Sequence, residues 1–66
     1  MTGTIRRLMD KGYGFIGVDG QEKDIFFHAK NLVGGAQFSD LKEGDMVTFE
    51  MEDSPRGPQA INVARA

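Results

Sequence analysis

Rings and cations suited to a flat, negatively charged ligand are concentrated in two short segments, residues 11–16 and 24–28. The first reads Lys-Gly-Tyr-Gly-Phe-Ile, and the second reads Asp-Ile-Phe-Phe-His. Aromatic rings stack on nucleobases, and neighbouring lysines or arginines neutralise phosphates. Arg6 and Arg7 lie just before the first segment. The chemistry that these residue types suit is stacking on unpaired bases.

Each segment alternates between two kinds of side chain, which is typical of a strand because successive side chains point to opposite faces. One face carries ring side chains, namely Tyr13, Phe15, Phe26 and His28. The other face carries apolar side chains, namely Ile16, Ile25 and Phe27. Asp19-Gly20 between the segments is a strong hairpin signal, so the two strands are expected to pair antiparallel.

A sheet this small has one core to fill, so rings on the face away from that core meet water. An exposed ring patch either contacts a partner or promotes aggregation. We expect Gly12 and Gly14 to leave the surface between the rings open to flat groups. The alternative places Tyr13 and Phe15 in the core and Ile16 outside; the glycines and the phase of the isoleucine argue against it.

Other functional interpretations of these residues are weaker. His28 is the only histidine and there is no cysteine, so a zinc site with three such ligands is not encoded. No motif places a nucleophile beside His28, which leaves an enzyme as the weakest alternative. Gly12 and Gly14 form a lone Gly-x-Gly, too little to indicate a nucleotide cofactor. Three carboxylates in or just after the fourth expected strand are interpreted as solvated charges: Glu50, Glu52 and Asp53.

Length and charge set further bounds. Sixty-six residues make one domain, 1–66. There is no apolar run of membrane-spanning length and no signal-like apolar region, so we expect a cytoplasmic protein that contacts no membrane. The net charge is −2, with +1 on residues 1–30 and −3 on residues 31–66. An acidic remainder discourages indiscriminate phosphate binding and leaves stacking as the main source of affinity.

The whole chain is expected to form a small all-β barrel. Strands are predicted at residues 2–8, 13–18, 23–28, 45–52 and 60–64, with one helical turn at 29–33, a loop at 37–44 and a turn at 54–58. The inward residues outside the two central strands are predicted to be Ile5, Val47, Phe49, Met51, Ile61 and Val63. Closing five short strands removes exposed edges, so we predict a five-stranded antiparallel barrel.

The two central segments resemble the paired ribonucleoprotein motifs of the cold-shock domain. Residues 43–49 and 57–60 resemble further parts of that family, so the likeness spans nearly the whole chain. It implies an oligonucleotide-binding (OB-fold) barrel that binds single-stranded RNA and DNA with little sequence preference. It also implies roles as a nucleic-acid chaperone, transcription antiterminator or translation regulator, with no cofactor and no small-molecule substrate.

Carried over by position, the resemblance gives a set of nucleic-acid-binding candidates. Tyr13, Phe15, Phe26 and His28 would stack on bases, and Asp24 would accept a hydrogen bond from a base edge. The cations would meet the backbone: Arg6, Lys11, Lys30 and Arg56. Phe38, in the long loop, would be either a further stacking ring or a residue that packs its own loop.

Two departures from the family pattern bear on the site. The family usually has Lys-Trp-Phe-Asn in its first strand, whereas this chain has Arg6-Arg7-Leu8-Met9 and is one residue shorter there. Arg7 is expected to replace the missing tryptophan in part, by stacking its guanidinium on a base. Ala29 also stands where an aromatic often follows the histidine. We therefore expect a weaker or shorter binding site on a monomer, and we retain a small protein-interaction barrel as the alternative.

Overall fold

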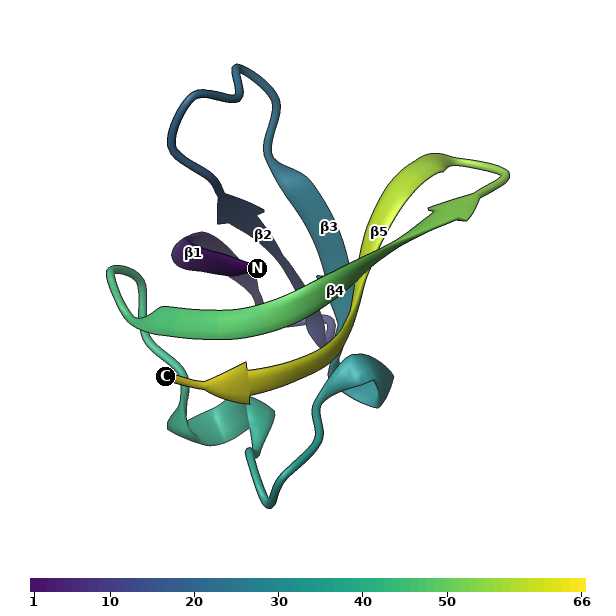
Figure 1. Cartoon of the computed structure of the whole chain (residues 1–66). Helices are drawn as coiled ribbons and strands as arrows, with labels where there is room; N and C mark the ends of the chain where they lie inside the picture. Colours follow the sequence, from purple (N-terminus) through teal and green to yellow (C-terminus); the bar gives the residue numbers. More distant parts are fainter.

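Five strands close into a barrel in the computed structural model, which describes residues 1–66 (Figure 1). Their bounds are β1 (Thr2–Met9), β2 (Tyr13–Gly17), β3 (Ile25–His28), β4 (Met46–Ser54) and β5 (Gly57–Arg65). Around the barrel they follow the order β1-β2-β3-β5-β4, and β4 also pairs with β1. The all-β class and the closed five-stranded barrel are as the sequence predicts.

One contact in this ring is parallel, and it joins β3 to β5 through Phe26 and Gln59. The other four contacts are antiparallel, as predicted. A closed ring with an odd number of strands cannot alternate direction at every contact. One parallel contact is therefore required by closure, and the prediction of a wholly antiparallel barrel is corrected at this point.

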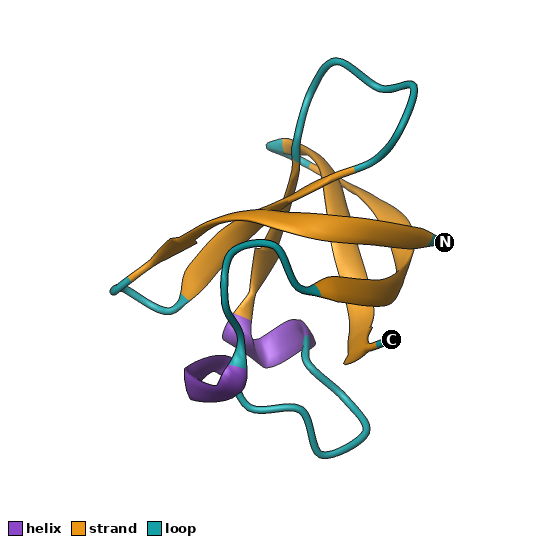
Figure 2. Ribbon diagram, turned by 90° about the vertical axis from the view of Figure 1, so that its left-hand side faces the viewer, coloured by secondary structure: helices purple, strands orange, loops and turns teal.

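The long connection between β3 and β4 forms two short turns at one end of the barrel (Figure 2). These 3-10 turns are η1 (Ala29–Asn31) and η2 (Phe38–Asp40). The predicted helical turn at residues 29–33 is thus present in a shorter form. Leu41, just after η2, is buried and belongs to the core, which the sequence pattern does not indicate. No helix here is long and apolar enough to span a membrane.

The core consists entirely of apolar side chains, and no polar or charged residue is buried in it. It comprises Ile5, Ile16, Ile25, Phe27, Leu41, Val47, Phe49, Ala60 and Val63. The predicted inward positions on β1, β2 and β3 are therefore confirmed. The ring residues Tyr13, Phe15 and Phe26 lie outside this set, half-buried on the opposite face of their strands.

Gly14 faces the barrel interior, which corrects the expectation that it opens the surface between the rings. A Cβ at this position would lie 2.5 Å from the backbone oxygen of Arg7 and 2.9 Å from the Phe27 ring. Gly14 pairs directly with Phe27 across the β2–β3 ladder. The missing side chain therefore leaves room for the buried ring of Phe27.

Met51 and Ile61 depart from their predicted inward positions. Met51 pairs with the buried Ala60, yet it is 38% exposed. The reason is that the β4–β5 hairpin, which contains Met51, projects beyond the rest of the barrel (Figure 1). Ile61 is only half-buried, because the β4–β5 register shifts by one residue beside it.

Asn62 marks that register shift, with a φ of 51°, the one positive φ outside glycine. The extra residue lets Ala60 and Val63 both face inward although they are three positions apart. Bulges of this kind increase the bend of a strand, which a small barrel requires. The side chain of Asn62 also donates a hydrogen bond to Glu50, at 2.7 Å.

The positive φ gives a direct stability test. Asn62→Val should lower the free energy of unfolding by about 1–2 kcal/mol, because branched side chains are strained in the left-handed region. Asn62→Gly, which loses the same hydrogen bond without that strain, serves as the matched control and should be close to the parent protein. Urea unfolding measures both variants, and equal losses in the two would contradict a left-handed bend at this residue.

Candidate functional site

The β2–β3 ladder brings the ring residues together on the outside of the barrel. Tyr13 pairs with His28, and Phe15 pairs with Phe26. Directly paired residues share a face of the sheet, so these four side chains form one surface. We call this surface the ring face; it consists of Tyr13, Phe15, Phe26 and His28.

Three members of the ring face form a close triangle. Their ring centroids are 6.1 Å apart for Tyr13 and Phe15, 5.6 Å for Tyr13 and Phe26, and 6.0 Å for Phe15 and Phe26. The two contacts of Phe15 are edge-to-face, an arrangement favoured by the ring quadrupoles. The triangle thus buries part of each ring while leaving the rest accessible.

The Phe15–Phe26 pair lies in a row that crosses four strands. Arg7 on β1 pairs with Phe15, and Phe26 pairs in turn with Gln59 on β5. The row therefore runs from a guanidinium, over two rings, to a side-chain amide. A flat group on the rings would have a cation at one end and a donor and acceptor at the other.

A β-bulge places two guanidiniums at the β1 end of that row. The β1–β2 register shifts between Ile5 and Arg7, so Arg6 is the extra residue. Both Arg6 and Arg7 are exposed as a result, instead of alternating in and out. The stem of Arg6 lies against Gly17, where a Cβ would collide with it. Bulges commonly re-aim side chains in this manner beside binding sites.

A hollow of about 490 Å³ lies at this end of the ring face. Its walls are Arg6, Arg7, Phe15, Lys23 and Asp24. The Arg6 guanidinium pairs with the Asp24 carboxylate at 3.5 Å, and the two side chains are 59% and 41% exposed. An ion pair this accessible is worth little and exchanges readily with other charges.

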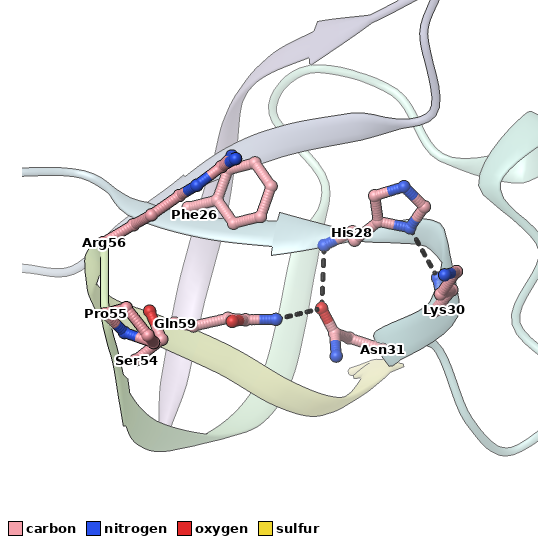
Figure 3. A pocket seen from close by; sticks show the side chains of 8 residues that line it. All are labelled: Phe26, His28, Lys30, Asn31, Ser54, Pro55, Arg56 and Gln59. Atoms are coloured by element: carbon pink, nitrogen blue, oxygen red, sulfur yellow. Dashed lines mark hydrogen bonds between the residues drawn. The ribbon is translucent and has the colours of Figure 1, made fainter.

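A second hollow, of about 390 Å³, lies at the opposite end of the ring face (Figure 3). It is bounded by Phe26, His28, Lys30, Asn31, Ser54, Pro55, Arg56 and Gln59. Arg56 also lines a neighbouring hollow with Phe15 and the exposed Met51, so the tip of the hairpin borders the rings on two sides. Cations therefore flank the ring face at both ends.

Asn31 organises this second hollow through one oxygen atom (Figure 3). Its Oδ1 accepts hydrogen bonds from the backbone N–H of His28, at 2.8 Å, and from the side-chain amide of Gln59, at 3.0 Å. The Nδ1 of His28 accepts from the backbone N–H of Lys30, at 3.1 Å. These bonds fix the imidazole beside the rings and tie the end of β3 to β5.

The predicted site residues divide into those the barrel gathers and those it does not. The two ends of the ring face hold Arg6, Arg7, Asp24, Lys30 and Arg56, together with the rings themselves. Lys11 is exposed in the turn before β2 and lines none of the hollows. Phe38 is half-buried against the core, with its ring centroid 6.3 Å from that of Phe27 on β3. Binding by any of them remains a prediction.

Sequence reasoning missed Asn31, Gln59 and Lys23 at the site. No pattern pointed to Gln59, because the predicted inward phase of Ile61 and Val63 also makes residue 59 inward. The register shift near Asn62 is what turns Gln59 outward. No pattern pointed to Asn31 either, since its position depends on a 3-10 turn that forms after a strand end. No group of three or more His, Cys, Asp or Glu side chains is arranged to hold a metal ion.

Comparisons with known proteins agree on one family. A family model described as the 'Cold-shock' DNA-binding domain matches residues 1–66. The "Cold shock-like protein CspE" of Bacillus anthracis is 44% identical over 66 residues, covering 98% of this chain and 96% of that protein. "Cold shock protein 1" of Lactiplantibacillus plantarum is 53% identical over 55 residues, covering 82% and 79%.

A solved structure gives the same result for the fold. The structure described as "drosophila Unr CSD456" matches with a TM-score of 0.80 at 25% identity. The match covers 98% of this chain but only 26% of that chain. The likeness therefore concerns the barrel, and the remainder of the larger protein has no counterpart here.

Proposed function

The chain belongs to the cold-shock DNA-binding domain family, whose members bind nucleic acid, and on that basis we propose that its ring face binds single-stranded RNA and DNA. Bases stack on Tyr13, Phe15 and Phe26, and the phosphates run past the flanking cations. Binding is tolerant of sequence because every base presents a flat face. Duplexes hide these faces, so unpaired strands are preferred.

The observation that carries the proposal is the triangle of rings outside the core. Half-buried rings with centroids about 6 Å apart are held in place before a ligand arrives. Fixed rings lose little conformational freedom on binding, so more of the stacking energy contributes to affinity. Each stacked base contributes roughly 1–3 kcal/mol as measured by truncation of its ring. Three rings are therefore enough to dominate the interaction.

The charges support a smaller, ionic contribution. Arg6, Arg7 and Lys23 lie at one end of the ring face, and Lys30 and Arg56 lie at the other. The chain as a whole has a net charge of −2, so long-range attraction to phosphate is weak. Affinity should consequently depend on salt through a few local contacts only.

The proposed cellular role follows from this passive mechanism. A cytoplasmic monomer that holds unpaired strands melts weak hairpins by mass action, as a nucleic-acid chaperone or antiterminator does. It requires no nucleotide cofactor and no catalytic group. Stacking rings occupy the surface around the only histidine, which supports a binding role for His28.

A protein-interaction module is the second candidate function. It is favoured by exposed carboxylates on β4 and its hairpin: Glu50, Glu52 and Asp53. These could recruit a basic partner while the ring face holds a strand. A gel shift with single-stranded and duplex oligonucleotides, run beside a pull-down with bare protein, distinguishes the two functions.

Removing one ring tests the stacking proposal. Phe15→Ala should weaken binding to an oligothymidylate roughly 5- to 150-fold, which corresponds to the loss of one stacked base. Phe15→Leu, which retains apolar volume without a ring, should also bind more weakly and guards against unfolding of the alanine variant. Met46→Ala, an exposed apolar residue on β4, is the control and should bind normally. Fluorescence titration and thermal melts measure these effects; unaltered affinity in both Phe15 variants would exclude stacking at this ring.

Removing one cation tests the path of the backbone. Arg56→Gln should reduce the slope of log binding constant against log salt concentration by roughly 0.7 in magnitude, if Arg56 neutralises one phosphate of a single strand. Arg65→Gln is the charge-matched control, because Arg65 lies at the far end of β5 and lines no hollow beside the rings. Titrations at several salt concentrations give the slopes. Identical slopes in both variants would remove Arg56 from the site.

A further inference from the structure

The hollow beside β1 differs from the rest of the ring face because charge dominates it. It contains three cations, Arg6, Arg7 and Lys23, against the single carboxylate of Asp24. Only one ring, Phe15, lines its wall. The bulge at Arg6 is what turns two consecutive guanidiniums outward here. This local surplus of positive charge lies within a protein of net charge −2.

The row of rings also stops at this hollow. Arg7 pairs with Phe15, but on its other side β1 has no neighbour at this point, since β4 pairs only with residues Thr2 to Thr4. No aromatic side chain extends the row beyond Arg7. A base stacked on Phe15 is thus the last that the rings can hold, and the next group meets guanidiniums.

We propose that this hollow binds the terminal phosphomonoester of a single strand whose end base stacks on Phe15. The inference rests on the proposed function and adds to it a preference for one kind of strand end. A terminal phosphate carries nearly two charges at neutral pH and three acceptor oxygens, whereas an internal phosphodiester carries one charge. Guanidiniums bind such a group with paired, charge-assisted hydrogen bonds.

The Arg6–Asp24 pair favours the doubly charged group over the singly charged one. Asp24 already occupies Arg6 at 3.5 Å, so an incoming phosphate must replace a carboxylate of one negative charge. A phosphodiester replaces one negative charge with one negative charge, whereas a phosphomonoester adds nearly one more negative charge beside Arg7 and Lys23. Because both members of the pair are exposed, the exchange costs little.

The experiment compares thymidine hexamers that differ only at their ends: hydroxyl at both ends, phosphate at the 5′ end, and phosphate at the 3′ end. A heptamer with hydroxyl ends controls for one added backbone charge. At about 0.05 M salt, phosphate at one of the two ends should tighten Kd roughly 3- to 10-fold, as expected for one new charge-assisted contact. The heptamer should gain less.

Lys23→Gln tests whether the gain requires this cation of the hollow. The ratio of Kd values for the hydroxyl and phosphate hexamers should fall toward one in this variant. Lys42→Gln, an exposed lysine that lines no hollow on the ring face, should retain the full ratio. Using the ratio makes the test independent of any change in overall affinity.

Other results of these titrations would overturn either the terminal-phosphate site or the proposed function. Equal binding of all three hexamers, or a gain at either end that survives Lys23→Gln, would overturn the terminal-phosphate site while leaving stacking in place. A gain in the heptamer that matches the phosphate gain would do the same, since it assigns the effect to charge alone. Failure of every hexamer to bind would overturn the proposed function and this inference together.

Discussion

The pairing of β2 with β3 determines which side chains enter the single interior of the barrel. Ile16 and Ile25 face each other inside, and so do Gly14 and Phe27. The alternate pairs of the same ladder face outward and make up the ring face. A slip of one residue would exchange the two sets, placing the rings inside and the aliphatic groups in water. The core and the candidate site therefore lie on opposite faces of the β2–β3 pair, and one register determines both.

This arrangement carries an energetic cost in so small a domain. A chain near this length buries only about 60% of its unfolded surface. Apolar groups left outside therefore reduce an already small stabilisation by the core. The triangle of rings offsets part of this cost, because its members are half-buried against one another. Each edge-to-face pair also contributes about 0.5–1.5 kcal/mol in addition to its buried surface area. A stacked ligand would cover what remains exposed. The exposed rings thus cost little stability in the free protein, and their remaining exposure is removed when a ligand binds.

Alternation made the central strands, their faces and the barrel predictable from the sequence, because those features depend on neighbours two positions apart. What the sequence did not reveal depends on contacts between distant segments. The bulge at Arg6 and the bend at Asn62 shift the period by one residue to fit a closing sheet. Leu41 and Asn31 acquire their roles from connections that return to the barrel after a strand has ended. Local pattern carries no information about either.

The most direct test of the account is a titration of the isotope-labelled protein with a thymidine hexamer, followed through the aromatic ring signals. If bases stack on the ring face, the signals of Tyr13, Phe15 and Phe26 shift strongly toward saturation. The ring of Phe27, directly beneath them in the core, shifts little. Binding that moves signals on the outer face of β4 and leaves the three outer rings unchanged would contradict the account.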